Sequence, residues 1–140
     1  MTQKINSILL TDDDPDDQFL FQEALFETDR SVSFFGAFDG IDVLEKLKSG
    51  GAKPDLLFLD VNMPRMNGID CLKELQKLEH LKRIPVIMYS TSSYYKKECF
   101  ENGAADYIEK LDDFSKLCAK LRDILDKGLP FQNTGYPDSL

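Results

Sequence analysis

The chain has 140 residues, of which 42% are hydrophobic and 30% are charged, and its formal net charge is -8. This length and composition predict one domain that buries its own hydrophobic core. The acidic balance suits a basic partner or a bound cation. It argues against general nucleic-acid or acidic-membrane binding, because both need a basic surface that offsets phosphate charge.

Apolar runs that predict strands alternate along the chain with segments of helical spacing. In chain order, the predicted strands lie at residues 7–10, 32–38, 55–59, 85–89 and 106–109. Helical spacing is found at residues 19–26, 43–47, 72–78 and 117–125. Acidic residues that suit the start of a helix occur at Asp14-Pro15, Asp39-Gly40 and Asp112-Asp113. The phenylalanines of the first helical segment, "FLFQEALF", are expected in the core.

Strands that alternate with helices predict right-handed βαβ units and a parallel sheet covered on both faces. We expect a flavodoxin-like (βα)5 three-layer sandwich whose five parallel strands have the order 2-1-3-4-5. The helical pattern ends after Lys127, and the following "GLPFQNTGYPDSL" contains two prolines and two glycines. We therefore expect one domain over residues 1–127 and an extension over residues 128–140.

The cysteines and the start of the chain indicate a cellular location. Cys71, Cys99 and Cys118 are odd in number and widely spaced, so neither a disulfide framework nor a zinc site is expected. The start, "MTQKINS", leads into only a short apolar run, which is not typical of a signal peptide. No apolar stretch approaches the length that spans a membrane. We expect a cytoplasmic protein with reduced cysteines.

Polar side chains follow four of the five predicted strands. In chain order these residues are Asp12, Asp13, Asp60, Ser90, Thr91 and Lys110. In an open parallel sheet, ligands bind beyond the carboxyl ends of the strands, near the point where the strand order reverses. The order 2-1-3-4-5 makes the first and third strands neighbours, so the three aspartates converge at one end of the sheet. A hydroxyl and an ammonium then close the other side of the site.

Converging carboxylates repel one another, and a divalent cation is their natural occupant. Oxygen ligands suit magnesium or manganese. Asp60 follows a strand that should be buried, and the loop after it contains Pro64 and a turn glycine, Gly68. We interpret Asp60 as a nucleophile toward phosphorus and Asp12 and Asp13 as cation ligands. Lys110 and Ser90 could hold the phosphoryl oxygens as charge develops.

The acidic run "LLTDDDPDDQ" has other readings that involve no phosphate chemistry. Asp14, Asp16 and Asp17 are interpreted as turn and helix-start charges. A calcium loop that begins at Asp12 would place Asp14, Asp16 and Glu23 at its third, fifth and twelfth positions. Its sixth position should be glycine but is Asp17, and a strand-like run precedes the loop where an EF-hand has a helix.

Together, the motifs "ILLTDDD", "LLFLDVNMPRMNG", "IPVIMYSTS" and "GAADYIEK" closely resemble the receiver domain of two-component response regulators, over residues 6–127. The resemblance implies that Asp60 accepts a phosphoryl group from a phosphohistidine of a sensor histidine kinase or a histidine phosphotransfer protein. It implies a Mg2+ site formed by Asp13, Asp60 and the backbone carbonyl of Asn62, with Asp12 acting largely through water.

The same resemblance implies a conformational switch. Ser90 would take a phosphoryl oxygen, Lys110 would pair with the phosphoryl group, and Tyr107 would turn inward. Asn62 and Ser92 would help to set the lifetime of the phosphate. The output would be a protein contact through the face of the fourth helix, fifth strand and fifth helix, with a downstream target or in a homodimer. Such a protein is no enzyme beyond its own phosphorylation and dephosphorylation.

One position departs from the common pattern of this family. Leu111 follows Lys110, where most receivers have a proline after a cis bond. A cis bond before a residue other than proline costs about 2.5–4 kcal/mol, so a trans bond is expected here. With this variant, "LKRIPVIMYSTSS" and a single domain, the chain is similar to the small stand-alone regulators associated with phytochromes.

Two functions of other classes use a similar set of residues. A haloacid-dehalogenase-type phosphohydrolase places its nucleophile in a DxD motif after the first strand, and Asp12-x-Asp14 fits superficially. The residues that follow are Pro15 and Asp16 instead of an apolar residue or threonine, and 140 residues leave little room for a cap. A phosphorylation-independent interaction module of the same fold would not need the complete set of carboxylates, hydroxyl and lysine.

Overall fold

The computed structural model describes residues 3–110 and 113–128. Five parallel strands form one sheet in the order β2-β1-β3-β4-β5, as the sequence predicts. The strands are β1 (Ser7–Thr11), β2 (Ser33–Ala37), β3 (Leu56–Leu59), β4 (Val86–Ser90) and β5 (Asp106–Glu109). The helices are α1 (Pro15–Thr28), α2 (Gly40–Lys48), α3 (Gly68–Gln76), α4 (Lys96–Glu101) and α5 (Phe114–Lys127).

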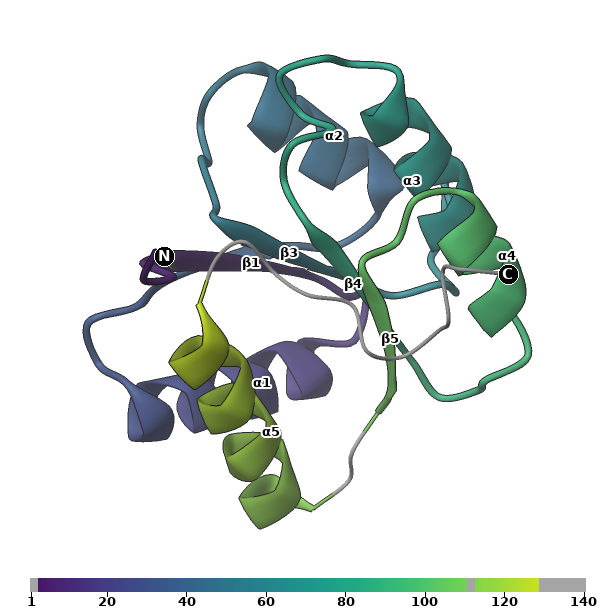
Figure 1. Cartoon of the computed structure of the whole chain (residues 1–140). Helices are drawn as coiled ribbons and strands as arrows, with labels where there is room; N and C mark the ends of the chain where they lie inside the picture. Colours follow the sequence, from purple (N-terminus) through teal and green to yellow (C-terminus); the bar gives the residue numbers. More distant parts are fainter. Residues whose placement is uncertain (1–2, 111–112, 129–140) are drawn as a thin grey trace.

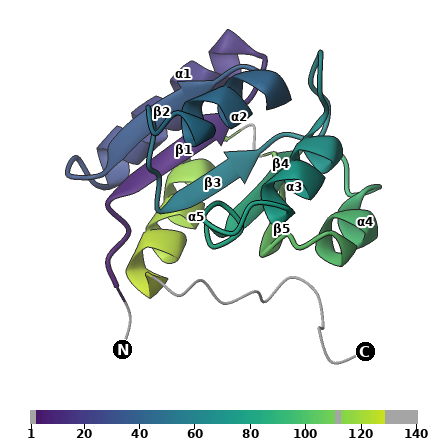
Figure 2. The ribbon, with the colours of Figure 1, turned by 90° about the horizontal axis from the view of Figure 1, so that it is seen from above.

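The helices cover both faces of the sheet and give three layers. The pair α1 and α5 lies on one face, and α2, α3 and α4 lie on the other (Figure 1). Neighbouring strands such as β1 and β3 run side by side in the same direction (Figure 2). Each strand is followed by a helix that returns the chain to the opposite edge, so all strands end at one edge of the sheet.

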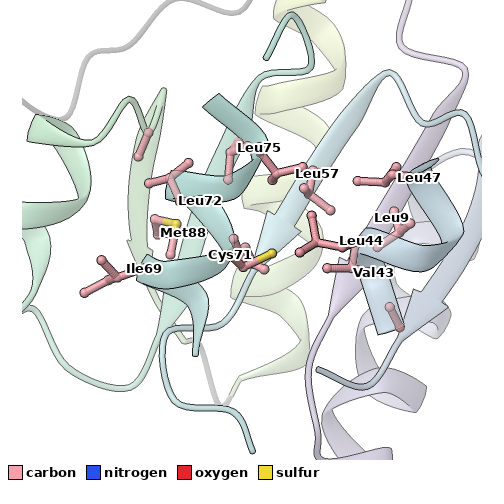
Figure 3. Close-up of a cluster of buried hydrophobic side chains, with 14 of the residues drawn as sticks. Leu9, Val43, Leu44, Leu47, Leu57, Ile69, Cys71, Leu72, Leu75 and Met88 are labelled. Atoms are coloured by element: carbon pink, nitrogen blue, oxygen red, sulfur yellow. The ribbon is translucent and has the colours of Figure 1, made fainter. Parts of the chain in front are cut away.

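Alternation along the strands supplies two apolar cores. Leu9, Leu57 and Met88 point from the central strands toward helices α2 and α3, where Leu44 and Leu72 pack against them (Figure 3). The intervening residues point to the other face and pack under α1 and α5. They include Ile8, Leu10, Leu56, Phe58, Ile87 and Tyr89. Side chains of a strand alternate between its faces, so a continuous apolar run is what a sheet covered on both faces requires.

The phenylalanines of α1 do not all lie in the core, which corrects the sequence interpretation. Phe21 is fully buried, and its ring centroid lies 4.9 Å from that of Phe58. Phe19 and Phe26 remain 64% and 51% exposed. These two are seven residues apart and share one side of the helix, whereas Phe21 lies on another. The composition of the helix did not indicate which side meets the sheet.

Side-chain caps begin four of the helices. The capping residues are Asp14 for α1, Asp39 for α2, Asn67 for α3 and Asp113 for α5. Asp14, Asp39 and Asp113 lie in the predicted helix starts, whereas Asp112 lies outside the described residues. The short helix α4 has no side-chain cap, and the sequence pattern did not mark its position.

Two expectations from the sequence concern parts of the chain that lie outside the described residues. These are the conformation of the Lys110–Leu111 bond and nearly all of the extension at residues 128–140. Among the helices of residues 3–110 and 113–128, none combines the length and apolar character needed to span a membrane.

The aromatic core provides a test of the packing. Phe58 is 1% exposed and contacts the rings of Phe21 and Tyr89. We expect Phe58→Ala to lower the free energy of unfolding by about 3–5 kcal/mol, because the cavity cannot close fully. Urea denaturation followed by circular dichroism measures this change. Phe19→Ala removes the same ring from an exposed position and should change stability by less than about 1 kcal/mol. Equal losses in both variants would contradict this packing.

Candidate functional site

Three carboxylates meet at the carboxyl end of the two central strands. Asp12 and Asp13 follow β1, and Asp60 follows the neighbouring strand β3. Asp12 and Asp60 are buried and Asp13 is exposed. One oxygen from each residue lies within 4.8 Å of those from the other two. The structure thus brings together the aspartates that the sequence predicts to converge.

A lysine directly after the fifth strand bridges two of these carboxylates. The ammonium of Lys110 lies 2.7 Å from Asp12 Oδ2 and 3.1 Å from Asp60 Oδ2. The backbone N–H of Lys110 donates to the Ser90 carbonyl at 2.7 Å and extends the β4–β5 pairing beyond β5. The Lys110 side chain is only 14% exposed, so its interactions with the carboxylates are poorly screened by water.

A further carboxylate, the fourth of the site and the third in contact with Lys110, comes from α1. Asp17 Oδ2, from the first turn of α1, lies 2.9 Å from Lys110 Nζ. Asp17 is therefore more than the helix-start charge that the sequence indicates. Asp17 and Lys110 are 93 residues apart in the chain. No local pattern could have paired them.

Burial and the interactions between Lys110 and the carboxylates have opposite effects on the ionisation of these groups. Burial raises the pKa of Asp12 to about 6 although hydrogen bonding to Lys110 lowers it, and burial also raises the pKa of Asp60. Burial alone would lower the pKa of Lys110, but its hydrogen bonds to Asp12 and Asp17 hold that pKa above its ordinary value. Four carboxylates face one ammonium, so negative charge remains in excess. A divalent cation with oxygen ligands fits this donor set.

Ser90 and Tyr107 lie on the neighbouring strands. Ser90 ends β4 and is fully buried, and its Oγ lies 3.4 Å from the backbone nitrogen of Ser92. Tyr107 on β5 is also buried, and its hydroxyl donates to the Ser92 carbonyl. Burial raises the pKa of Tyr107. The Tyr107 ring therefore already lies in the core, and its hydroxyl is tied to the segment that follows Ser90. Thr91, the other hydroxyl of the sequence prediction, is exposed.

The loop between β3 and α3 is fixed to the neighbouring loop by an ion pair. Arg65 Nε lies 2.7 Å from Asp39 Oδ2, and a second guanidinium nitrogen lies 3.0 Å from Asp39 Oδ1. The hydrogen bond from Arg65 holds the pKa of Asp39 below its ordinary value. Arg65 has a φ of 63°, which residues other than glycine seldom adopt. Sequence reasoning missed this pair, because no local signal links the two loops.

Gly68 is required for a different reason than the sequence suggested. It is the first residue of α3, and its φ is not positive, so it is no turn glycine. A Cβ atom at this position would lie 2.1 Å from the backbone oxygen of Asp60. Only glycine permits α3 to begin so close to the Asp60 backbone. The Asn62 backbone N–H, in the same loop, lies 3.4 Å from Asp60 Oδ1.

The calcium-loop and DxD interpretations do not fit this arrangement. A strand precedes Asp12, and the segment that would form most of the calcium loop, up to Glu23, is helical from Pro15 onward. Asp14 is exposed and uses its side chain to accept from the Asp16 backbone N–H at 2.9 Å. Asp14 is therefore a helix cap and no partner of Asp12 in phosphate chemistry.

Comparison with known proteins agrees with this geometry. The family model of the response regulator receiver domain matches residues 8–122. The chain belongs to the response regulator receiver family. A protein-glutamate methylesterase/protein-glutamine glutaminase of Clostridium acetobutylicum is 38% identical over 108 residues, which are 74% of this chain and 30% of that protein. The transcriptional regulatory protein CpxR of Klebsiella pneumoniae is 39% identical over 123 residues, which are 86% of this chain and 50% of CpxR.

Two solved response regulators are similar to this receiver along most of their length. The phosphorylated cyanobacterial phytochrome response regulator RcpA superimposes with a TM-score of 0.80 at 28% identity, covering 90% of this chain and 95% of RcpA. The Mn(2+)-bound form of response regulator Rcp1 gives a TM-score of 0.75 at 26% identity, covering 94% and 99%. By contrast, the receiver spans at most half the length of the two curated relatives above.

The buried carboxylates predict a pH dependence of stability. In cation-free protein, burial raises the pKa of Asp12 from its ordinary value of 3.8 to about 6. Between these values the folded state binds more protons, so raising the pH favours unfolding; the raised pKa of Asp60 acts in the same direction. As the pH is raised from 4 to 7, we expect the free energy of unfolding of Asp12→Asn to increase by about 1–3 kcal/mol relative to that of wild type. Urea denaturation at a series of pH values measures this difference, and parallel curves would contradict it.

The close approach at Gly68 provides a second prediction. We expect Gly68→Ala to lower the free energy of unfolding by about 1–3 kcal/mol or more, because backbone atoms must move to admit the methyl group. Thermal or urea denaturation measures the loss. Gly51→Ala is the matched control, since its methyl group would lie 3.3 Å from the Ser49 hydroxyl and 3.7 Å from the Lys46 backbone oxygen, with no backbone atom as close as at Gly68. If the two variants were equally stable, the Asp60 backbone would not be constrained in this way.

Proposed function

We propose that this receiver is a phosphoacceptor, in which Asp60 takes a phosphoryl group from a phosphohistidine of a sensor histidine kinase or a histidine phosphotransfer protein. The observation that carries the proposal is the contact of the Lys110 ammonium with both Asp12 and Asp60, beside Asp13. A carboxylate that faces a cation site and an ammonium can approach an anionic phosphoryl group, because both positive charges offset the repulsion.

Asp60 is better placed than Asp12 to react. The Asp12 side chain is 0% exposed, one oxygen accepts from the Asp14 backbone N–H, and the other contacts Lys110. The Asp60 side chain keeps 8% exposure, and only a long contact of 3.4 Å reaches its Oδ1. A phosphoryl donor can therefore approach an Asp60 oxygen more readily than an Asp12 oxygen.

The transfer step places simple demands on these residues. An Asp60 oxygen forms a bond to phosphorus while the bond between phosphorus and the imidazole nitrogen breaks, and that nitrogen keeps the electron pair. Asp60 must be ionised to attack, and the Lys110 ammonium favours its ionised form against the effect of burial. The same ammonium can pair with the transferred group, and the Ser90 hydroxyl can donate a hydrogen bond to one of its oxygens.

The acidic group is suited to Mg2+, which the proposed function requires. Asp12, Asp13, Asp60 and the backbone carbonyl of Asn62 would hold the ion. When bound, Mg2+ would neutralise charge on the phosphoryl oxygens. The excess of carboxylates over ammonium groups supports this assignment, and the Mn(2+)-bound form of Rcp1 is consistent with it.

Phosphorylation would then change a protein-interaction face. The modification adds about -1.5 to -2 charges beside Ser90. Movement of Ser90 toward the phosphoryl group would pull on Ser92, whose carbonyl accepts from the Tyr107 hydroxyl. We propose that this link carries the change to the face of α4, β5 and α5, where a downstream protein or a second copy of the chain would bind.

The proposal assigns this chain a signalling role and no catalytic activity toward other substrates. The similarity to the methylesterase covers only 30% of that protein. We propose a cytoplasmic protein whose targets are other proteins. A net charge of -8 does not favour binding to nucleic acid or an acidic membrane.

Intact-mass measurement tests the proposal directly. Wild-type protein incubated with Mg2+ and acetyl phosphate should gain one phosphoryl group, and a metal chelator should prevent the gain. Asp60→Asn should remain unlabelled because it lacks the accepting oxygen, whereas Asp70→Asn, an exposed acid on α3, should be labelled like wild type. No label on wild type, or a label that persists in Asp60→Asn, would contradict the proposal. Rapid turnover of many phosphate esters would instead indicate a hydrolase.

A further inference from the structure

The Lys110 ammonium contacts three carboxylates, of which two belong to the possible cation site and one does not. Asp12 and Asp60 belong, with Asp13, to the set whose oxygens could hold one cation. Asp17 Oδ2 lies 2.9 Å from Lys110 Nζ but is not part of that set. Asp17 is therefore the lysine's only carboxylate contact in the described part of the chain that a cation would not share.

We propose that Asp17 is a positioning residue, which keeps the Lys110 ammonium in the site when a divalent cation is bound. The inference rests on the proposed function, since it concerns the same phosphoryl transfer. It adds a fourth carboxylate, from α1, to the residues on which that transfer depends.

Electrostatics gives the reason for this role. A divalent cation held by Asp12, Asp13 and Asp60 brings two positive charges close to the Lys110 ammonium, and like charges repel strongly in a site with little water. The same cation also weakens the attraction of Asp12 and Asp60 for the ammonium. Asp17 would not be a ligand of the cation, so its attraction for the Lys110 ammonium is not weakened in this way. The lysine can therefore stay beside Asp60, where the phosphoryl group would arrive.

The structure holds Asp17 at a fixed position relative to the sheet. The next residue, Gln18, is buried, and its side-chain nitrogen donates to the carbonyls of Leu10, Asp12 and Ala37 at 3.1, 3.1 and 2.8 Å. These hydrogen bonds connect the first turn of α1 to β1 and to the end of β2. Asp17 thus meets Lys110 from a fixed helix turn.

Asp16 provides a matched control on the same turn. It is exposed and makes no ion pair within the described residues, and its backbone N–H is engaged by the Asp14 cap. Asp16→Asn removes one negative charge at nearly the same place as Asp17→Asn. A difference between the two variants therefore reports the contact with Lys110 and not the net charge of the helix start.

The first measurement is the chemical reactivity of Lys110. Wild type, Asp17→Asn, Asp17→Glu and Asp16→Asn are treated with an amine-acetylating reagent, with and without saturating Mg2+, and Lys110 labelling is followed by peptide mass spectrometry. Circular dichroism confirms that each variant is folded. We expect Mg2+ to raise Lys110 labelling several-fold in Asp17→Asn and to leave it nearly unchanged in wild type and Asp16→Asn.

The second measurement is the rate of phosphorylation by acetyl phosphate. At saturating Mg2+ we expect Asp17→Asn to react about tenfold more slowly than Asp16→Asn, with little change in the Mg2+ concentration at half-maximal rate. Asp17→Glu should recover most of the rate, because its carboxylate can still reach Lys110. A rate of Asp17→Asn within twofold of Asp16→Asn, or Lys110 labelling in Asp17→Asn that Mg2+ does not affect, would overturn the inference. If wild type gained no phosphoryl group, the proposed function would fail, and the labelling comparison would still test Asp17.

Discussion

The Lys110 ammonium, almost enclosed among carboxylates, is the interaction on which the site depends. Asp12, Asp17 and Asp60 come from the end of β1, the start of α1 and the end of β3, and Lys110 follows β5. Burial raises the pKa of Asp12 and Asp60, and the ammonium opposes this effect. Because one positive charge does not balance four negative ones, the same arrangement favours a divalent cation.

The fold fixes the site through contacts that lie outside it. Gln18 connects the first turn of α1 to the ends of β1 and β2. The Asp39–Arg65 pair joins the loops after β2 and β3, and Gly68 lets α3 begin against the Asp60 backbone. These contacts position Asp60 and the loop that follows it. The carboxylates are therefore held in place by packing and hydrogen bonds, and not by their own interactions alone.

The comparisons extend this view to the family. The family model covers most of this chain, whereas the two curated relatives extend well beyond the matched region. This chain shares 28% identity with RcpA and still superimposes over nine-tenths of its length. Such a superposition at low identity is consistent with one fold that different sequences can form. The contact between Asp17 and Lys110 shows that residues beyond these strand ends also bear on the site.

The sequence alone determined the strand order and the main site residues. Short apolar runs predicted the strands. Polar residues directly after the strands predicted that Asp12, Asp13, Asp60 and Lys110 meet. These signals are local, so a single chain can display them. Tertiary structure alone decided which side of α1 is buried, that Asp17 reaches Lys110, that Arg65 pairs with Asp39, and why position 68 must be glycine. The two ion pairs join segments distant in the chain. The buried side of α1 and the close approach at Gly68 depend on how the elements pack, which no local pattern specifies.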